Sequence, residues 1–128
     1  KKSLVKMAGI AHITGGGVWR KFREILPSGV GAYLTFIPPN SLLSEVEEMA
    51  KEFLELRLSD HEMYGTFHGG CGMLVVCETE EDARILFKLA ANRKISTIWA
   101  GRTMESGEKE IIINSQYKEK RLLSSKDL

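Results

Sequence analysis

The sequence predicts an α+β fold, in which helices cover a mixed β-sheet as α/β/α layers with a partly ferredoxin-like order. Two observations support this prediction. Short runs rich in apolar, β-branched and aromatic residues alternate along the chain with segments whose apolar residues recur every three or four positions. The 128 residues are 43% hydrophobic and 27% charged, which is enough for one domain around one hydrophobic core.

Glycine and proline residues divide the first half of the chain into elements. Gly15–Gly17 separates an apolar run from a stretch with helical spacing, and Pro38 and Pro39 end a run typical of a strand. Ser41 or Ser44 is a candidate N-cap for the next helix. In chain order we therefore expect a strand over 8–14, a helix over 18–26, a strand over 32–37 and a helix over 44–53.

Three strands and one helix are predicted in the second half. The continuous apolar run at 73–77 is typical of a strand that is buried on both faces, and hence of the middle of a sheet. Thr79 and Asp82 have the spacing that caps a helix. A helix over 83–90, strands over 95–100 and 110–114, and a hairpin-like turn at Ser106 and Gly107 complete the pattern. The segment 59–67 is too short and too polar to assign.

The domain is expected to cover residues 1–115, and the charged segment 116–128 is expected to be a frayed C-terminal tail. Six aromatic residues are predicted to lie in the core rather than to form a platform for stacking nucleic-acid bases. These residues are Trp19, Phe22, Phe36, Phe53, Phe67 and Phe87.

Charge and hydropathy exclude several classes of function. The chain carries 18 Lys and Arg against 17 Asp and Glu, a formal net charge of +1, so no broad positive field attracts nucleic acid or an acidic membrane. Because no stretch approaches 18 consecutive apolar residues, we expect a cytoplasmic protein without a membrane segment. Cys71 and Cys77 would stand about 20 Å apart in an extended chain, too far for a disulfide bond, and they lack the spacing of a zinc site.

Seven of the 12 glycines fall into two clusters, Gly15–Gly17 and the four glycines at 65, 69, 70 and 72. The first cluster lies between a predicted strand and a predicted helix. Free N–H groups at a helix start attract an anion there, and the missing side chains let it approach, while Thr14 adds a hydroxyl. A plain tight turn is the alternative, because the run matches neither the dinucleotide-binding nor the phosphate-binding loop pattern.

The second cluster carries polar side chains at the entrance of a predicted strand, and it could line one cleft with the first. His68, surrounded by glycine, has room to reach a substrate and exchanges protons near neutral pH, so it is the candidate catalytic residue. Structural roles compete for the other polar residues: Asp60 and His61 as loop residues in solvent, Glu62 as the cap of a turn, and His12 as a hydrogen-bonded core histidine. The spacing of the three histidines predicts no metal site.

Three stretches together resemble the C-terminal domain of aminoimidazole ribonucleotide synthetase, also called phosphoribosylformylglycinamidine cyclo-ligase. They are AHITGGG at 11–17, ILPSGVGA at 25–32 and EMYGTFHGGCGM at 62–73. The resemblance runs from about Met7 to about Asn114. It implies an AIR synthase-like C-terminal-domain fold and a two-domain enzyme of purine biosynthesis whose N-terminal ATP-binding domain is absent from this chain.

The resemblance also implies an activity. In that family, ATP phosphorylates the amide oxygen of formylglycinamidine ribonucleotide, and an internal nitrogen then displaces phosphate to close the imidazole ring. ATP and Mg²⁺ would be held mainly by the N-terminal domain, and the full-length protein would be a homodimer. The present domain would form one wall of the cleft that holds the phosphorylated substrate, and in isolation it is expected to be inactive.

Carried over by position, the resemblance implies two edges of that wall. The first edge is His12, Thr14, Gly15, Gly16 and Gly17, and the second is Glu62, Thr66, His68 and Gly69. The family pattern has Arg where this chain has Gly65 and Asn where it has His68, so one possible bidentate phosphate contact is lost. Two alternatives stay open: a non-catalytic ligand-binding or assembly module of the same fold, and a related ATP-dependent enzyme with another substrate.

Overall fold

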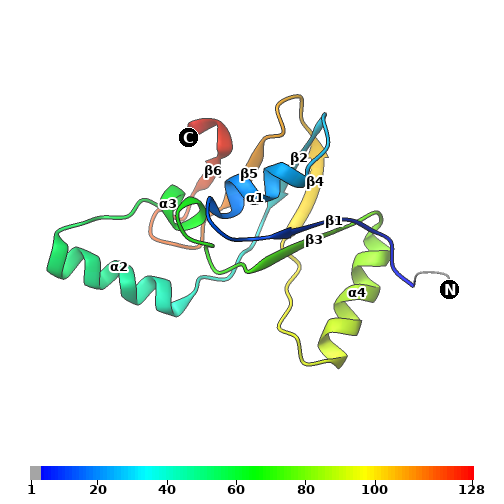
Figure 1. The fold of residues 1–128 in the computed structure, drawn as a ribbon, viewed down its shortest axis with the longest axis horizontal. Helices are drawn as coiled ribbons and strands as arrows, with labels where there is room; N and C mark the ends of the chain where they lie inside the picture. Colours follow the sequence, from blue (N-terminus) through cyan, green and yellow to red (C-terminus); the bar gives the residue numbers. More distant parts are fainter. Residues whose placement is uncertain (1–3) are drawn as a thin grey trace.

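The computed structural model describes residues 4–128 of the chain, and Figure 1 shows their arrangement. The helices are α1 (Gly17–Ile25), α2 (Ser41–Leu54), α3 (Asp60–Gly65) and α4 (Glu80–Asn92), and a short 3₁₀ helix, η1 (Ser125–Asp127), lies near the C-terminus. The strands are β1 (Met7–His12), β2 (Val30–Leu34), β3 (Met73–Cys77), β4 (Gly101–Glu105), β5 (Ile111–Asn114) and β6 (Leu122–Ser124).

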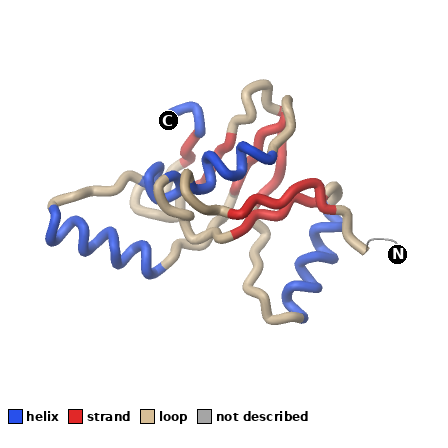
Figure 2. Tube along the Cα trace, in the orientation of Figure 1, coloured by secondary structure: helices blue, strands red, loops and turns tan. Residues whose placement is uncertain are grey.

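The strands form two separate sheets (Figure 2). β1 and β3 make an antiparallel ribbon in which Ala11 faces Leu74 and His12 faces Met73. The second sheet has the order β4-β2-β5-β6, with β2 antiparallel to β4 and parallel to β5. This mixed sheet and the four helices confirm the predicted α+β class.

Helix α1 forms the centre of the core. Its apolar residues recur at helical spacing, so Trp19 and Phe22 face inward, where both are nearly excluded from solvent. They join buried side chains of α3 and of the four-stranded sheet, including Tyr64 and Ile113. The indole N–H of Trp19 donates a 3.0 Å hydrogen bond to the carbonyl oxygen of His61. Helix α1 is thereby fixed to α3, and its N-terminus lies beside the residues that follow α3.

Strand β3 is not in the middle of a sheet, contrary to the prediction. Within residues 4–128 it pairs with β1 alone, and only alternate residues face the core. Leu74 is buried, whereas Met73 and Val75 are exposed on the outer face of the ribbon. The continuous apolar run therefore reflects an apolar outer face rather than burial on both sides.

The predicted hairpin near the C-terminus is also wrong. Residues 95–100 form no strand, and β4 begins at Gly101. β4 and β5 are joined by a turn through Ser106 and Gly107, but β2 lies between them and pairs with both. β2 and β5 hold the two inner positions of this sheet, and both carry buried side chains, such as Leu34 and Ile113.

Residues 116–128 do not form the expected frayed tail. β6 pairs with β5, and the side chains of Tyr117 and Leu123 are buried. The hydroxyl of Ser125 accepts a 2.9 Å hydrogen bond from the backbone N–H of Ile111. The charged residues that favoured fraying lie on one exposed turn, 118–121.

Helices α2 and α4 extend from the body toward the two ends of its long axis (Figure 1). For this reason two of the predicted core aromatics, Phe53 on α2 and Phe87 on α4, are exposed. Phe36, in the segment between β2 and α2, is exposed as well. Asn40, rather than Ser41 or Ser44, is the N-cap of α2, since its side-chain oxygen accepts from the N–H of Leu43. The predicted cap of α4 is confirmed: the Thr79 hydroxyl accepts from the N–H of Asp82. No helix among the described residues is both long and apolar enough to cross a lipid bilayer.

Candidate functional site

The two glycine clusters lie on loops that meet. We name residues 14–17 the first glycine loop and residues 65–72 the second glycine loop. The backbone N–H of Ile13, just before the first loop, donates a 3.0 Å hydrogen bond to the carbonyl oxygen of Gly72. At the start of α1, the α-carbon of Gly17 lies against the backbone of residues 64–67. The sequence-based expectation that these two distant loops adjoin is therefore confirmed.

Gly17 is required for this contact and is not open to a ligand. Its φ of 58° lies in the left-handed region, and a Cβ there would stand 2.6 Å from the carbonyl oxygens of Gly65 and Phe67. The Gly17 N–H already donates to the carbonyl oxygen of Thr14 at 2.9 Å. The prediction that Gly17 contacts substrate is therefore corrected: peptide carbonyls occupy the place where an anion would approach.

The outer part of the first loop is accessible. Thr14 and Gly15 are exposed, Gly16 is half-buried, and a Cβ built on Gly15 would meet no atom within 4 Å. On the second loop, Thr66 is exposed and Gly65 is half-buried. The residues with room for a ligand are thus Thr14 and Gly15 on one side and Thr66 on the other, while the side chain of Arg20 covers Gly16.

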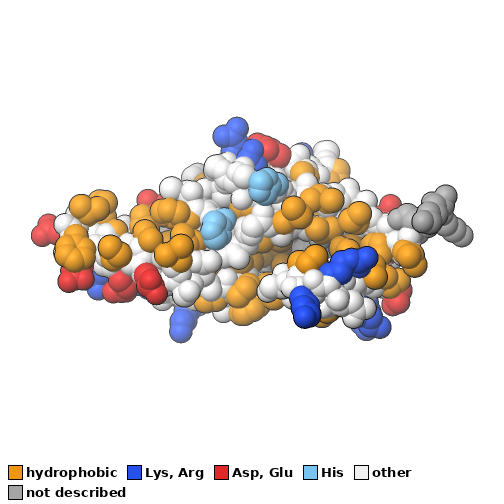
Figure 3. Space-filling view, turned by 60° about the horizontal axis from the view of Figure 1, so that its bottom comes forward, with side chains coloured by type: hydrophobic (Ala, Val, Ile, Leu, Met, Phe, Trp, Pro, Cys, Tyr) orange, Lys and Arg blue, Asp and Glu red, His pale blue; other side chains and the backbone are white. Residues whose placement is uncertain are grey.

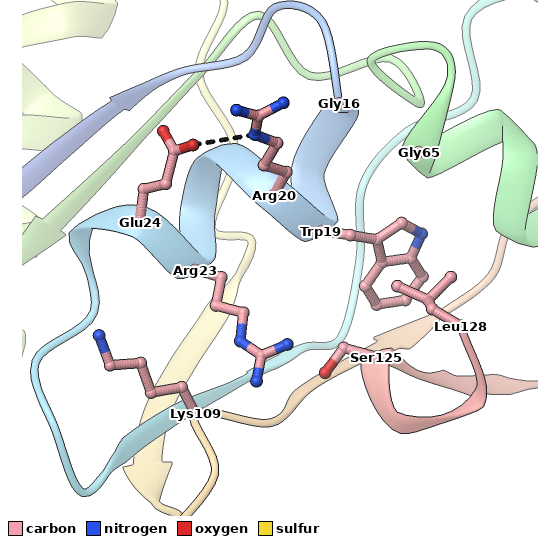
Figure 4. A pocket seen from close by; sticks show the side chains of 9 residues that line it. All are labelled: Gly16, Trp19, Arg20, Arg23, Glu24, Gly65, Lys109, Ser125 and Leu128. Atoms are coloured by element: carbon pink, nitrogen blue, oxygen red, sulfur yellow. Dashed lines mark hydrogen bonds and ion pairs between the residues drawn. The ribbon is translucent and has the colours of Figure 1, made fainter.

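A cleft of about 470 Å³ opens where the two loops meet (Figure 4). Gly16 and Gly65 form part of its wall, and three cationic side chains, Arg20, Arg23 and Lys109, line it. Trp19, Glu24, Ser125 and Leu128 complete the lining. Three cationic side chains against one anionic side chain, Glu24, give the lining a net positive charge, which favours a ligand that carries negative charge.

The two arginines of the cleft are held in different ways. The Arg20 side chain folds back over Gly16, and its Nε donates to Glu24 at 3.0 Å. Nη2 of Arg23 donates to the carbonyl oxygen of Glu108 at 3.0 Å. Figure 4 shows the Arg23 guanidinium extending across the cleft toward Ser125. Because a carbonyl bond leaves the guanidinium charge uncompensated, Arg23 keeps donors for an incoming anion.

The side chain of Tyr64 packs against the second glycine loop. The ring of this buried residue lies directly against Gly69, whose φ is 63°. Above it, Nδ1 of His68 accepts a 3.0 Å hydrogen bond from the N–H of Gly70. That bond makes Nδ1 the acceptor, so in the neutral ring the proton resides on Nε2. Gly69 thus has a packing role, while His68 presents a donor.

Of the predicted site residues, Gly16 alone lines the cleft, and the others, His12 and Glu62 among them, lie outside its lining. His12 is exposed on β1, opposite Met73 of β3, and is not the core histidine that its apolar neighbours favour. The carboxylate of Glu62 caps α3: its Oε2 accepts from the N–H and the hydroxyl of Ser59 at 2.7 and 2.8 Å. Both bonds lower the pKa of Glu62 below its ordinary value of 4.5, and the bond from the Ser59 backbone N–H has the larger effect. Helix capping accounts for Glu62 without a ligand.

Sequence reasoning missed the buried acid beside this site. Asp60, expected in solvent, is only 2% exposed and accepts hydrogen bonds from the Ser115 hydroxyl at 2.5 Å and from the Glu119 N–H at 3.0 Å. The hydroxyl of Tyr64 accepts from the N–H of Gln116 at 3.1 Å. The Ser59–Glu62 spacing is a capping box, and it was the available signal that 59–67 contains a helix.

Metal-binding chemistry finds no support in this part of the molecule. Across residues 4–128, no three His, Cys, Asp or Glu side chains gather as a metal site would require. Cys71 and Cys77 are both free thiols, and burial raises the pKa of each.

Comparisons with known proteins show the family of this chain. A family described as AIR synthase related protein, C-terminal domain, matches residues 2–114. A phosphoribosylformylglycinamidine cyclo-ligase from Pseudothermotoga lettingae is 38% identical over 110 residues, which are 84% of this chain and 30% of that protein. The proteins of the same name from Methylobacillus flagellatus and Caldicellulosiruptor bescii are 32% and 31% identical, and each covers 85% of this chain.

The chain spans about 30% of the length of these relatives. The match includes both glycine loops and ends at the last residue of β5. It confirms the resemblance that the three sequence stretches indicated: the chain belongs to the AIR synthase related family, of which it holds the C-terminal domain.

Proposed function

We propose that this chain is the C-terminal domain of a phosphoribosylformylglycinamidine cyclo-ligase and that its basic cleft holds the phosphate of formylglycinamidine ribonucleotide. The observation that carries the proposal is the meeting of Gly16 and Gly65 at a cleft lined by three cationic side chains. The relatives, named as cyclo-ligases, support an enzymatic family. In the assembled enzyme this domain would form one wall of the active site.

Arg20, Arg23 and Lys109 supply positive charge in the cleft, which Gly65 cannot supply. Where the family pattern has an arginine, this chain has Gly65, but Arg20 and Arg23 line the same cleft from α1. A guanidinium binds two phosphate oxygens at once, and Lys109 adds a second cation. The exposed Thr14 hydroxyl and the open backbone at Gly15 would then contact the rest of the substrate.

We assign His68 the role of a hydrogen-bond donor to the substrate. With Nδ1 engaged by the Gly70 N–H, its Nε2 is a hydrogen-bond donor. In the family reaction the phosphorylated amide oxygen leaves as phosphate when the internal nitrogen closes the ring, and a donor at this oxygen would stabilise the negative charge that develops on it. The described residues offer no carboxylate cluster that would hold Mg²⁺. We therefore assign both cofactors to an N-terminal domain, the partner expected from the greater length of the relatives.

Calorimetric titration of the 128-residue chain with formylglycinamidine ribonucleotide tests the binding role. Arg23→Gln should weaken binding about tenfold or more, because a hydrogen bond to a charged group contributes about 1.5–3 kcal/mol. Gly15→Ala should also weaken binding, since its Cβ would enter the open space in front of the loop. The matched control is Gly107→Ala, where a Cβ also meets nothing within 4 Å. Equal affinities in all four proteins would contradict the proposed phosphate site.

The catalytic role needs the rest of the enzyme. A chimera would join this chain to the N-terminal part of the Pseudothermotoga lettingae relative, and ADP release would be measured with formylglycinamidine ribonucleotide and ATP. We expect activity in the chimera, none in the isolated chain, and a loss of kcat in a His68→Ala chimera. Binding without activity in the chimera would favour the alternative of a non-catalytic ligand-binding module. Activity with a different phosphorylated substrate would favour a related enzyme.

A further inference from the structure

Positive charge is concentrated in the basic cleft. On the side of the molecule that Figure 3 turns forward, Lys and Arg side chains are scattered among apolar ones. In the cleft, by contrast, Arg20, Arg23 and Lys109 line one cavity. Ser125 lines the same cavity and belongs to residues 115–128, which lie beyond the family match. A segment outside the match therefore completes the wall of the cleft.

The 115–128 segment is fixed to the body of the domain on both sides of Ser125. Its strand β6 pairs with β5, and the hydroxyl of Ser124 donates to Oε1 of Glu110 at 2.7 Å. On the other side, Nζ of Lys126 lies 3.3 Å from the same carboxylate group. These contacts hold Ser125 at a defined place in the cleft wall.

The hydroxyl of Ser125 has a hydrogen that no group accepts. The residue is only 8% exposed, and its oxygen accepts a 2.9 Å hydrogen bond from the N–H of Ile111. A hydroxyl that accepts through its oxygen still has its own hydrogen to donate. Within residues 4–128, no atom takes this hydrogen. Because an unsatisfied buried donor is unfavourable, the arrangement favours a ligand that brings an acceptor.

Ser125 and Arg23 direct their donors to one space. Figure 4 shows the Ser125 oxygen turned toward the Arg23 guanidinium. Both side chains line the cleft and also an adjoining hollow of about 530 Å³, and no hydrogen bond joins them in the described part of the chain. A guanidinium can only donate, and the Ser125 hydroxyl has a donor to spare. A group with several acceptor oxygens, such as a phosphate, can satisfy both.

Lys126 offsets the negative charge at this end of the cleft. Glu108 lines the adjoining hollow, and Glu110 follows nearby in the chain. Nζ of Lys126 lies 3.3 Å from a carboxylate oxygen of each. Opposite charges at this distance largely compensate each other. The positive charge of Arg23 and Lys109 therefore remains available to an anion.

We propose that the Ser125 hydroxyl donates a hydrogen bond to the phosphate that Arg23 binds, so that the 115–128 segment takes part in ligand binding. This inference rests on the proposed function, which places a phosphate monoester in the cleft. The guanidinium contacts two phosphate oxygens, and the hydroxyl contacts a third. The N–H of Ile111, which donates to the same hydroxyl, holds its oxygen in place and strengthens it as a donor.

Calorimetric titration with formylglycinamidine ribonucleotide compares the native chain with Ser125→Ala. The variant should bind about tenfold more weakly, the loss expected for one hydrogen bond to a charged group. Ser124→Ala is the matched control, because its hydroxyl donates to Glu110 and lies outside the cleft lining. Each variant loses a bond inside the fold, so the melting temperature should fall in both. The affinity should fall in Ser125→Ala alone, which separates ligand binding from a structural role.

Amide NMR of the native chain gives a test that needs no variant. Binding of formylglycinamidine ribonucleotide should shift the N–H signal of Ile111, because the hydroxyl that accepts from it gains an acceptor of its own. The signal of Asn92, at the end of α4, should not move. Inorganic phosphate should compete with the ribonucleotide and shift the same signal, since the proposed contacts all go to the phosphate.

The outcomes distinguish this inference from the proposed function. A native chain that binds no ribonucleotide would contradict the proposed function and the role of Ser125 together. Native binding that weakens in Arg23→Gln but not in Ser125→Ala would support the phosphate site and overturn the role of Ser125. An Ile111 signal that stays in place while the ligand binds would also overturn it. Equal losses of affinity in Ser125→Ala and Ser124→Ala would show a structural role instead.

Discussion

The carbonyl oxygen of Tyr64 lies directly against the α-carbon of Gly17, and through this contact the C-terminal end of α3 meets the N-terminal end of α1. The partial charges of the two helix ends are opposite, so the arrangement is electrostatically favourable. The ring of the same tyrosine supports Gly69 on the second glycine loop. One residue therefore sets the position of both loops that border the cleft.

Gly17→Ala should disrupt this junction. A left-handed backbone costs a residue with a side chain roughly 1–2 kcal/mol, and forcing a methyl group against packed carbonyls costs about 1–3 kcal/mol more. We therefore expect the free energy of unfolding to fall by about 2–5 kcal/mol in a urea titration. The control is Gly15→Ala, two residues earlier, where the Cβ meets no atom within 4 Å. Equal stability of the two variants would show that Gly17 is not tightly packed.

Removing the hydroxyl of Tyr64 should cost stability but leave the loops in place. In Tyr64→Phe the N–H of Gln116 loses its acceptor, which costs about 1–3 kcal/mol, while the ring still supports Gly69. Tyr64→Ala removes the ring as well and should cost about 3–5 kcal/mol. Amide NMR signals of Gly69 and Gly70 should shift little in the first variant and strongly in the second. Large shifts in both would place the hydroxyl, rather than the ring, under the loop.

The meeting of the two glycine loops could be predicted because both clusters flank strands, and strands bring distant segments together. The start of α4 was equally predictable, since Thr79 and Asp82 are close in sequence and their cap is local. The helix α1 was also predictable from a local signal, because its apolar residues recur at helical spacing and form the face that is buried.

The burial of Asp60 could not be predicted, because its partner Ser115 is 55 residues away and nothing local indicates that they meet. The exposure of Phe53 and Phe87 was missed for a related reason. A helical apolar stripe shows that one face of a helix seeks a partner, but it does not say whether that partner is in the same chain. Both errors, on Asp60 and on the two phenylalanines, have the same cause: they depend on contacts between residues that are distant in the sequence or that belong to another chain.

The pairing of Asp60 with Ser115 should be measurable as an energetic coupling. Asp60→Ala leaves two donors, the Ser115 hydroxyl and the Glu119 N–H, without an acceptor, and each costs about 1–3 kcal/mol. Ser115→Ala removes one of these donors but deprives the Tyr117 N–H of its acceptor. The double variant should be less destabilised than the sum of the single ones, with a coupling of about 0.5–3 kcal/mol. Additive effects would mean that the two side chains do not interact in solution.

Acid should loosen α3 by protonating Glu62. The Ser59 N–H and hydroxyl bind the ionised carboxylate, so the pKa of Glu62 in the folded chain is lower than its ordinary value of 4.5. A lowered pKa means that the cap stabilises the fold fully above pH 4.5 and is lost as the pH falls through the folded value. Glu62→Gln removes this titration. The native chain should therefore exceed Glu62→Gln in unfolding free energy by a constant amount near neutral pH, and the difference should shrink below pH 4.5.

Urea titrations of both proteins between pH 7 and pH 3 measure this difference. Glu105→Gln is the control, since the Glu105 side chain is exposed on β4 and lies outside α3. A gap between native and Glu62→Gln chains that is the same at every pH would show that the carboxylate charge does not hold the cap. Because α3 leads directly into the second glycine loop, the same acid range should weaken binding of the proposed ligand, formylglycinamidine ribonucleotide, in the native chain more than in Glu62→Gln.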